Sequence, residues 1–210
     1  MRKVLFSVLA VAMFILPASA QANMLDNPGF ESWVDYQGAN VPDNWWHMFS
    51  DVDVAGTQSS NAKSGSSSGQ ITITGSGWGG WGQWVSESVT AGQTFYAYQP
   101  INIPTALNNA EAVLELKFQD SGGATVGSAL LANRTTATNG WEALSLSGVA
   151  PTGAAKLSYT VLVRDTASGA SGTVYFDDSY ADTQPVPEPA SLLLLGLGLA
   201  GIFVFKRNKA

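Results

Sequence analysis

The chain has no cysteine among its 210 residues. Disulfide bonds, thiol catalysis and cysteine-ligated metal sites are therefore excluded. An exported domain without disulfides depends on its hydrophobic core for stability, with or without a bound metal ion. The 22 glycines and the low share of charged residues, 12%, are typical of an all-β domain with many turns.

Basic residues are scarce between the two ends of the chain. Residues 23–184 contain five lysines and arginines against fifteen aspartates and glutamates, a formal charge of −10. This balance argues against nucleic acid as a partner, because binding its phosphates requires a basic surface. It is typical of an extracellular domain.

Residues typical of enzyme active sites are also few. His47 is the single histidine, so the chain cannot build a structural zinc site by itself. No nucleophile elbow and no phosphate-binding loop is present. None of the carboxylates stands in a recognisable catalytic context. We therefore expect that the protein is not an enzyme.

The first 22 residues have the three parts of a secretory signal peptide. Arg2 and Lys3 give a positive start, residues 4–16 are apolar, and small residues follow for cleavage after Ala20 or Ala22. The apolar run is too short to span a bilayer. Residues 1–22 are therefore predicted to direct export and to be removed.

The C-terminal residues form three successive segments. Residues 183–189 are a proline-rich linker, in which the prolines enforce extended backbone. Residues 190–205 are apolar apart from Ser191, and as a helix they would be about 24 Å long, short of a hydrocarbon core of about 30 Å. Residues 206–210 are a basic tail, expected on the cytoplasmic side. The sequence predicts a short transmembrane helix.

This terminus resembles the PEP-CTERM sorting signal of Gram-negative bacteria. Pro187, Glu188 and Pro189, the apolar segment and the basic cluster match its three parts in order and spacing. The resemblance implies recognition by an exosortase, a membrane protease-transpeptidase, after export by the secretion machinery. It also implies a place at the cell surface or in the extracellular matrix, with transient or persistent membrane anchoring.

Between these ends, short runs alternate between apolar and polar residues. The runs cover residues 70–74, 81–89, 94–98, 112–118, 156–164 and 173–180, whereas residues 59–69 are rich in serine and glycine and are expected to form a loop. No long amphipathic helix is indicated. Residues 23–182 are therefore predicted to fold as an all-β sandwich.

The same region resembles the carbohydrate-binding-module-like jelly rolls of the galactose-binding superfamily. The resemblance rests on several short motifs in the right order, at residues 23–31 (NMLDNPGFE), 42–45, 62–65, 82–85 with 91–95, 141 with 149–154, and 173–178 (TVYFDD). One position departs from the family, because Ser179 and Tyr180 follow the closing Asp-Asp where an apolar residue is usual. The resemblance implies a jelly-roll β-sandwich.

The family resemblance also implies a structural calcium ion that joins the first and last strands. Its ligands would be Glu31 and Asp177, with Asp178 as an alternative and Asp53 as a further oxygen donor. Calcium requires six to eight oxygen ligands, so backbone carbonyls would have to complete the set. The alternative is that these acids face solvent or accept hydrogen bonds from loop amides.

Aromatic residues are the candidates for ligand binding. Three of the seven tryptophans cluster among glycines at residues 78–84, and flat indole rings suit the apolar faces of sugars. Trp81 and Trp84 lie on opposite faces of the expected strand, so one of them is expected in the core. The candidate ligand-binding residues are Trp78, Trp81, Trp46, Tyr96 and Tyr98, the tyrosines only if their strand face is the concave one.

The sequence thus predicts a non-catalytic surface or matrix protein whose β-sandwich binds polysaccharide. A purely structural matrix or adhesion protein without a sugar site is the main alternative. A glycan hydrolase is a more distant one.

Overall fold

The computed structural model of the protein describes residues 23–50, 52–86 and 88–185. The predicted signal peptide, the transmembrane segment, the basic tail and the motif residues Pro187, Glu188 and Pro189 lie outside the described residues. Every regular element within these ranges is a β-strand, which confirms the all-β class. No helix in the described part is long and apolar enough to cross a membrane.

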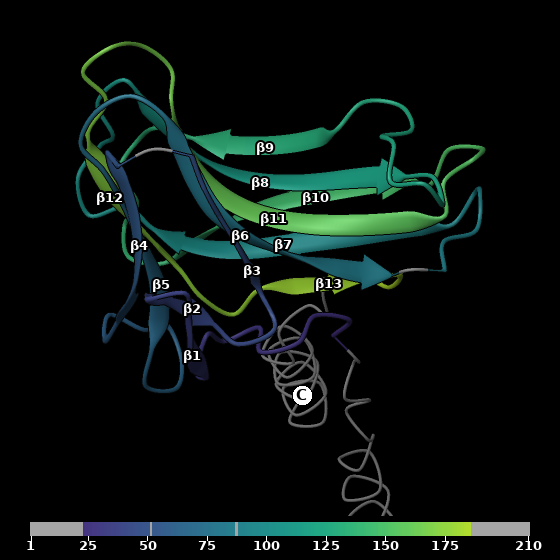
Figure 1. Ribbon diagram of the computed structural model, residues 1–210, viewed down its shortest axis with the longest axis horizontal. Coiled ribbons are helices and arrows are strands. Elements are labelled where there is room, and N and C mark those ends of the chain that lie inside the picture. Colours follow the sequence, from purple (N-terminus) through teal and green to yellow (C-terminus); the bar gives the residue numbers. More distant parts are fainter. Residues whose placement is uncertain (1–22, 51, 87, 186–210) are drawn as a thin grey trace, which may run out of the picture.

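Two antiparallel sheets pack face to face as a jelly-roll β-sandwich (Figure 1). The five-stranded sheet has the order β3 (Trp46–Phe49), β6 (Trp78–Ser86), β11 (Lys156–Asp165), β8 (Ala110–Gln119) and β9 (Leu130–Arg134). The six-stranded sheet has the order β10 (Glu142–Val149), β7 (Thr94–Asn102), β12 (Gly172–Phe176), β5 (Ser68–Ile73) and β4 (Val54–Ser59), with β13 (Tyr180–Asp182) paired to β7. A separate hairpin joins β1 (Trp33–Tyr36) and β2 (Ala39–Pro42).

The core lies between the sheets and follows from strand alternation. On β11, Tyr159, Val161 and Val163 are fully buried, and their neighbours on β8 in the same register are Leu116, Leu114 and Ala112. The intervening residues of both strands point to the other face of the sheet, because successive side chains alternate. The five-stranded sheet therefore has one apolar inner face, which packs against the other sheet, and one outer face, which does not.

Aromatic rings fill one end of this core around Trp81. Phe49 and Trp33 contact Trp81 at ring-centroid distances of 5.7 and 5.8 Å, and Phe30 lies 6.0 Å away. A Cβ on Gly56 would come within 2.5 Å of the Trp81 ring, so this strand position must be glycine. The prediction that Trp81 contacts a ligand is wrong, because its side chain is completely buried.

The last expected strand, residues 173–180, is instead two short strands separated by a bend. β12 ends at Phe176 and β13 begins at Tyr180. Asp178 has a φ of 48°, and this left-handed residue interrupts the strand, which then continues in the same direction along β7 as β13. The bend lies where the sequence departs from the family pattern, and the buried Ser179 hydroxyl there donates a hydrogen bond of 2.5 Å to Gln99 Oε1.

Candidate functional site

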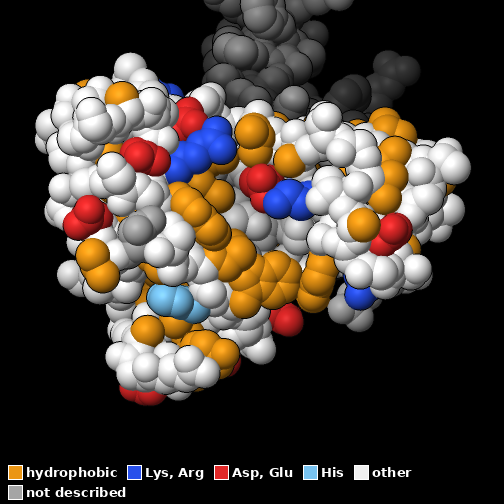
Figure 2. Space-filling view, turned by 45° about the horizontal axis from the view of Figure 1, so that its top comes forward, with side chains coloured by type: hydrophobic (Ala, Val, Ile, Leu, Met, Phe, Trp, Pro, Cys, Tyr) orange, Lys and Arg blue, Asp and Glu red, His pale blue; other side chains and the backbone are white. Residues whose placement is uncertain are grey.

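The outer face of the five-stranded sheet carries a cleft of about 520 Å³. Side chains from β3, β6, β8 and β11 line it, so the central strands of the sheet form its floor. Figure 2 shows hydrophobic side chains gathered in a band across this side of the molecule, with acidic and basic side chains beside them. The cleft therefore combines an apolar surface with charged groups.

Three tryptophans line the cleft. The Trp46 and Trp84 rings meet edge to face, with centroids 5.2 Å apart and an interplanar angle of 70°. Trp78 lies six residues from Trp84 on β6, which is about 20 Å along a strand, and its side chain is 42% exposed. The cleft thus has an aromatic pair near one end and a single indole near the other.

Two glycines of β6 lie between Trp78 and Trp84 on the cleft side of the strand. Gly80 and Gly82 occupy the positions of β6 that alternate with the buried Trp81 and therefore face the cleft. A Cβ on Gly82 would overlap the Trp46 indole, so the absence of a side chain is what lets that ring lie against β6. Glycine at this position therefore allows the Trp46 ring to form part of the cleft surface.

Two ion pairs lie on the same face. Arg164 Nε and Nη2 each lie 2.7 Å from Glu111 Oε1, and Asn133 donates a hydrogen bond to the other oxygen of this carboxylate. Lys117 Nζ lies 2.9 Å from Glu115 Oε1. Glu111 and Glu115, the carboxylates of β8 on this face, are therefore already bound by cations.

The remaining aromatic candidates, Tyr96 and Tyr98, lie on β7 in the six-stranded sheet. Both are half-buried and alternate with the core residues Phe95 and Ala97, so they point to the outer face of that sheet. The outer faces of the two sheets lie on opposite sides of the sandwich. The cleft therefore contains the predicted residues Trp46 and Trp78 but neither tyrosine.

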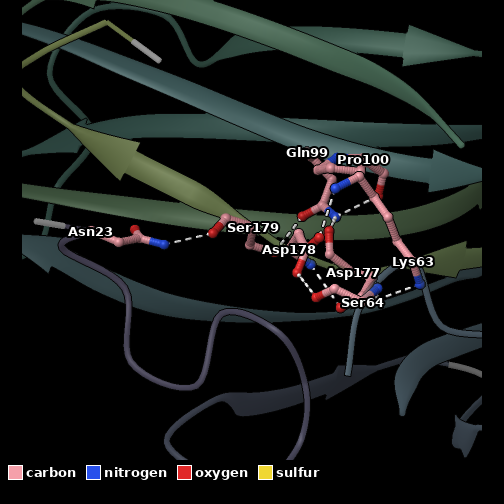
Figure 3. Close-up of polar contacts among 8 residues, drawn as sticks. All are labelled: Asn23, Lys63, Ser64, Gln99, Pro100, Asp177, Asp178 and Ser179. Carbon is pink, nitrogen blue, oxygen red and sulfur yellow. Dashed lines mark hydrogen bonds and ion pairs between the residues drawn. The ribbon is translucent and has the colours of Figure 1, made fainter. Parts of the chain in front are cut away.

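The predicted calcium ligands meet at a second place, which we call the latch and define as Glu31, Lys63, Ser64, Asp177 and Asp178. Asp177 Oδ2 accepts hydrogen bonds from the backbone N–H groups of Lys63 and Ser64, at 2.7 and 3.2 Å (Figure 3). The Asp178 carboxylate binds Lys63 Nζ at 2.7 Å and the Ser64 hydroxyl at 2.6 Å. The latch thereby fixes the loop after β4 to the bend before β13.

Glu31 binds the next residues of the same loop. Its carboxylate accepts hydrogen bonds from the N–H groups of Ser66 and Ser67, each at 3.0 Å, and from the Ser66 hydroxyl at 2.6 Å. The side-chain hydrogen bond from Ser66, followed by the backbone donor of Ser67, lowers the pKa of Glu31 below its ordinary value of 4.5. Burial raises the pKa of Asp177, and its three backbone donors oppose that shift only partly.

These contacts do not form the ligand shell that calcium requires. Each carboxylate oxygen of the latch accepts an N–H, an O–H or an ammonium group, and the described residues contain no group of three acidic, histidine or cysteine side chains placed to hold a metal. Asp53 lies at the far end of the β4–β5 ladder, next to Thr74, whereas Ser67 and the latch adjoin the other end. Calcium binding therefore stays a prediction from the resemblance.

We expect Glu31→Gln to lower the stability of the protein at neutral pH. A depressed carboxyl pKa means that the ionised form favours the folded state, so its contribution is present above the unfolded pKa and is lost as the pH falls through the folded pKa. Thermal melts of both proteins from pH 7 to pH 3 should therefore converge at the acidic end. A constant difference in melting temperature over this range would contradict the assignment.

Several residues in or beside the cleft were not predicted as site residues from the sequence: Trp84, Met48, Lys117 and Arg164 line it, and Lys156 lies over the Trp84 ring. Alternation along β6 could have identified Trp84, because residues an even number of positions apart, such as Trp78 and Trp84, lie on the same face of a strand, and Trp81 lies on the other face. The residues of β8 and β11 could not be identified in this way, because their place beside β6 follows from the strand order alone.

Comparison with known proteins identifies the sorting motif at the C-terminus and the fold of the β-sandwich. Residues 185–208 match the model of the PEP-CTERM protein-sorting motif, and the chain therefore carries a signal for export and membrane-associated sorting in Gram-negative bacteria. No curated protein is similar to the chain in sequence.

Solved structures with the same fold include carbohydrate-binding modules. TmCBM61, solved in complex with β-1,4-galactotriose, is 19% identical with a TM-score of 0.52, over 78% of this chain and 100% of that one. The C-terminal family 22 module of Clostridium thermocellum Xyn10B is 17% identical with a TM-score of 0.52, over 78% and 99%.

The enzymatically active domain of tailspike protein 4 from bacteriophage CBA120 is 17% identical with a TM-score of 0.58, over 76% of this chain. The present chain spans only 21% of that protein. These likenesses establish the jelly-roll fold of carbohydrate-binding modules.

Proposed function

We propose that the protein is an exosortase-sorted, non-catalytic polysaccharide-binding protein that acts at the cell surface or in the extracellular matrix. The observation that carries the proposal is the Trp46–Trp84 pair in the cleft, with the Trp46 ring over Gly82. The sorting motif supplies the destination, and the cleft supplies the binding surface.

The chemistry of the cleft suits a sugar chain. Pyranose rings present flat C–H faces to aromatic rings, and an indole offers a large contact area at a small cost in side-chain entropy. Gly82 leaves room for the Trp46 indole, and Thr160 and Ser158 on β11 place hydroxyl groups beside Gly82 and Trp84. A cleft lined by four of the five strands of the sheet fits an extended chain better than a single sugar.

The structural neighbours agree with this proposal. TmCBM61 is a whole domain of this fold bound to an oligosaccharide. In the family 22 module, conserved amino acids in the cleft have a role in ligand binding. Both are matched over nearly their entire length, so the likeness in fold extends over each whole module.

Tryptophan substitutions in the cleft test the proposal directly. We expect Trp46→Ala and Trp84→Ala each to weaken binding to soluble polysaccharides by about 30-fold, the effect of removing a central aromatic anchor. Affinity electrophoresis against xylan, β-1,4-galactan and polygalacturonate gives the dissociation constants. The matched control is Tyr96→Ala, which removes an aromatic ring from the outer face of the other sheet.

The outcomes separate this function from a purely structural role. If the folded wild-type domain binds no polysaccharide, including material from its own host, the proposal is wrong and the structural alternative is favoured. If Tyr96→Ala weakens binding and Trp46→Ala does not, the site lies on the six-stranded sheet instead.

A further inference from the structure

The basic residues of this acidic domain are unevenly placed. Only five lie within residues 23–184, and three of them, Lys117, Lys156 and Arg164, lie on the cleft face of β8 and β11. Lys117 and Arg164 line the cleft itself. Lys156 alternates with the cleft residue Ser158, and its Nζ lies 5.3 Å from the centroid of the Trp84 ring. Cations are therefore concentrated where the ligand is proposed to bind.

The acids of this face lie beneath the cations. The Glu111 side chain is 9% exposed, whereas that of its partner Arg164 is 40% exposed. Glu115 is 18% exposed, and its partner Lys117 is 34% exposed. The carboxylates hold the cationic side chains in place, and the atoms presented to solvent belong mainly to the cations. With Lys156 included, the face has one more positive than negative charge.

Each end of the cleft combines a cation with an indole. Lys156 lies over Trp84 near one end, and Lys117 stands opposite Ser158, the register partner of Trp84. Arg164 is the register partner of Trp78 near the other end. Eight residues of β11 separate Lys156 from Arg164, which is about 27 Å along the strand.

We propose that the cleft selects an anionic polysaccharide, with carboxylates on the sugar chain binding Lys117 and Lys156 at one end and Arg164 at the other. The inference rests on the proposed function, because the sugar rings would stack on the same tryptophans. A carboxylated sugar can place its ring on an indole and its charge against the adjacent cation. A neutral glycan would make no use of these three charges.

The acidity of the rest of the domain makes this arrangement selective. At low ionic strength the formal charge of −10 repels a polyanion from every surface except the cleft. At physiological salt this repulsion is screened beyond about 8 Å, and the short-range contacts in the cleft decide binding. We therefore expect affinity for an acidic polymer to depend on the cleft cations rather than on overall charge.

A pair of polymers that differ only in charge tests the inference. Polygalacturonate and its carboxyl-reduced form share the same backbone, and we expect the acidic polymer to bind the wild-type domain about tenfold more tightly. Equal affinity for both would overturn the charge selectivity and leave the proposed function intact. Absence of binding to these two polymers, to xylan and to β-1,4-galactan would overturn both.

Lys156→Gln supplies the matched variant, because it removes a cleft charge without breaking either ion pair. We expect it to reduce the preference for polygalacturonate over the reduced polymer several-fold, and Lys156→Arg to restore the preference. Arg134→Gln removes one positive charge from the edge of β9, where Arg134 pairs with Glu142 on β10, and should leave the preference unchanged. An equal loss in Arg134→Gln and Lys156→Gln would show that net charge, not the cleft, governs binding.

Discussion

Trp81→Ala is expected to lower the free energy of unfolding by about 4 kcal/mol. The Trp81 side chain is completely buried and contacts Phe30, Trp33 and Phe49, so the truncation leaves a large cavity between the sheets. Gly56 and Gly69 contact the ring from β4 and β5 and offer no side chain that could fill the space. For a domain of this size the melting temperature should fall by about 8–16 °C.

Trp78→Ala provides the control on the same strand. Trp78 lies on the opposite face of β6 from Trp81, and its side chain is 42% exposed. Its removal should therefore change the free energy of unfolding by less than about 1 kcal/mol. The two substitutions should therefore affect different properties: Trp81→Ala should lower the melting temperature, and Trp78→Ala should weaken glycan binding. Similar melting temperatures for the two variants, measured by calorimetry, would contradict the assignment of Trp81 to the core.

The strands that alternation predicted are mainly those at the centre of the sheets. β8 and β11 carry long period-two runs, because each presents one face to the core and one to the other side. β4 (VAGTQS) and β9 (LLANR) carry no such run, since edge strands bury few side chains. β10 was also missed, although Leu144 and Leu146 alternate with Ser145 and Ser147 in the sequence.

The candidate site was predictable only in part. Glycines and tryptophans at residues 78–84 identified the strand. Alternation placed Trp81 and Trp84 on opposite faces but did not decide which of them lies in the core, and the one assigned to the site, Trp81, is the core residue. The cations of the cleft come from β8 and β11, which pair with each other and with β6 only after folding. A single sequence contains no signal for such long-range pairing, so Lys117, Lys156 and Arg164 could not be assigned to the cleft.

Asp177→Ala should be the most damaging substitution in the latch, with an expected loss of about 3 kcal/mol in the free energy of unfolding. The Asp177 side chain is fully buried and accepts hydrogen bonds from the N–H groups of Lys63, Ser64 and Asp178. Removing it leaves three partly buried N–H donors without their partner, and the desolvation penalty of an unpaired donor exceeds the net contribution of the lost bond. The loop after β4 would then lose its attachment to the bend before β13.

Asp178→Ala is the appropriate comparison, because its carboxylate is less buried than that of Asp177 and binds the Lys63 ammonium and the Ser64 hydroxyl rather than backbone amides. Partly exposed ion pairs contribute little to stability, so this neighbour should cost about 1 kcal/mol or less. Melting each variant in excess calcium and in chelator also tests the metal prediction. Since the latch oxygens already accept protein donors, we expect the Asp177→Ala loss to be equal in both buffers. A larger loss in calcium would show that the ion binds Asp177 and adds to the latch.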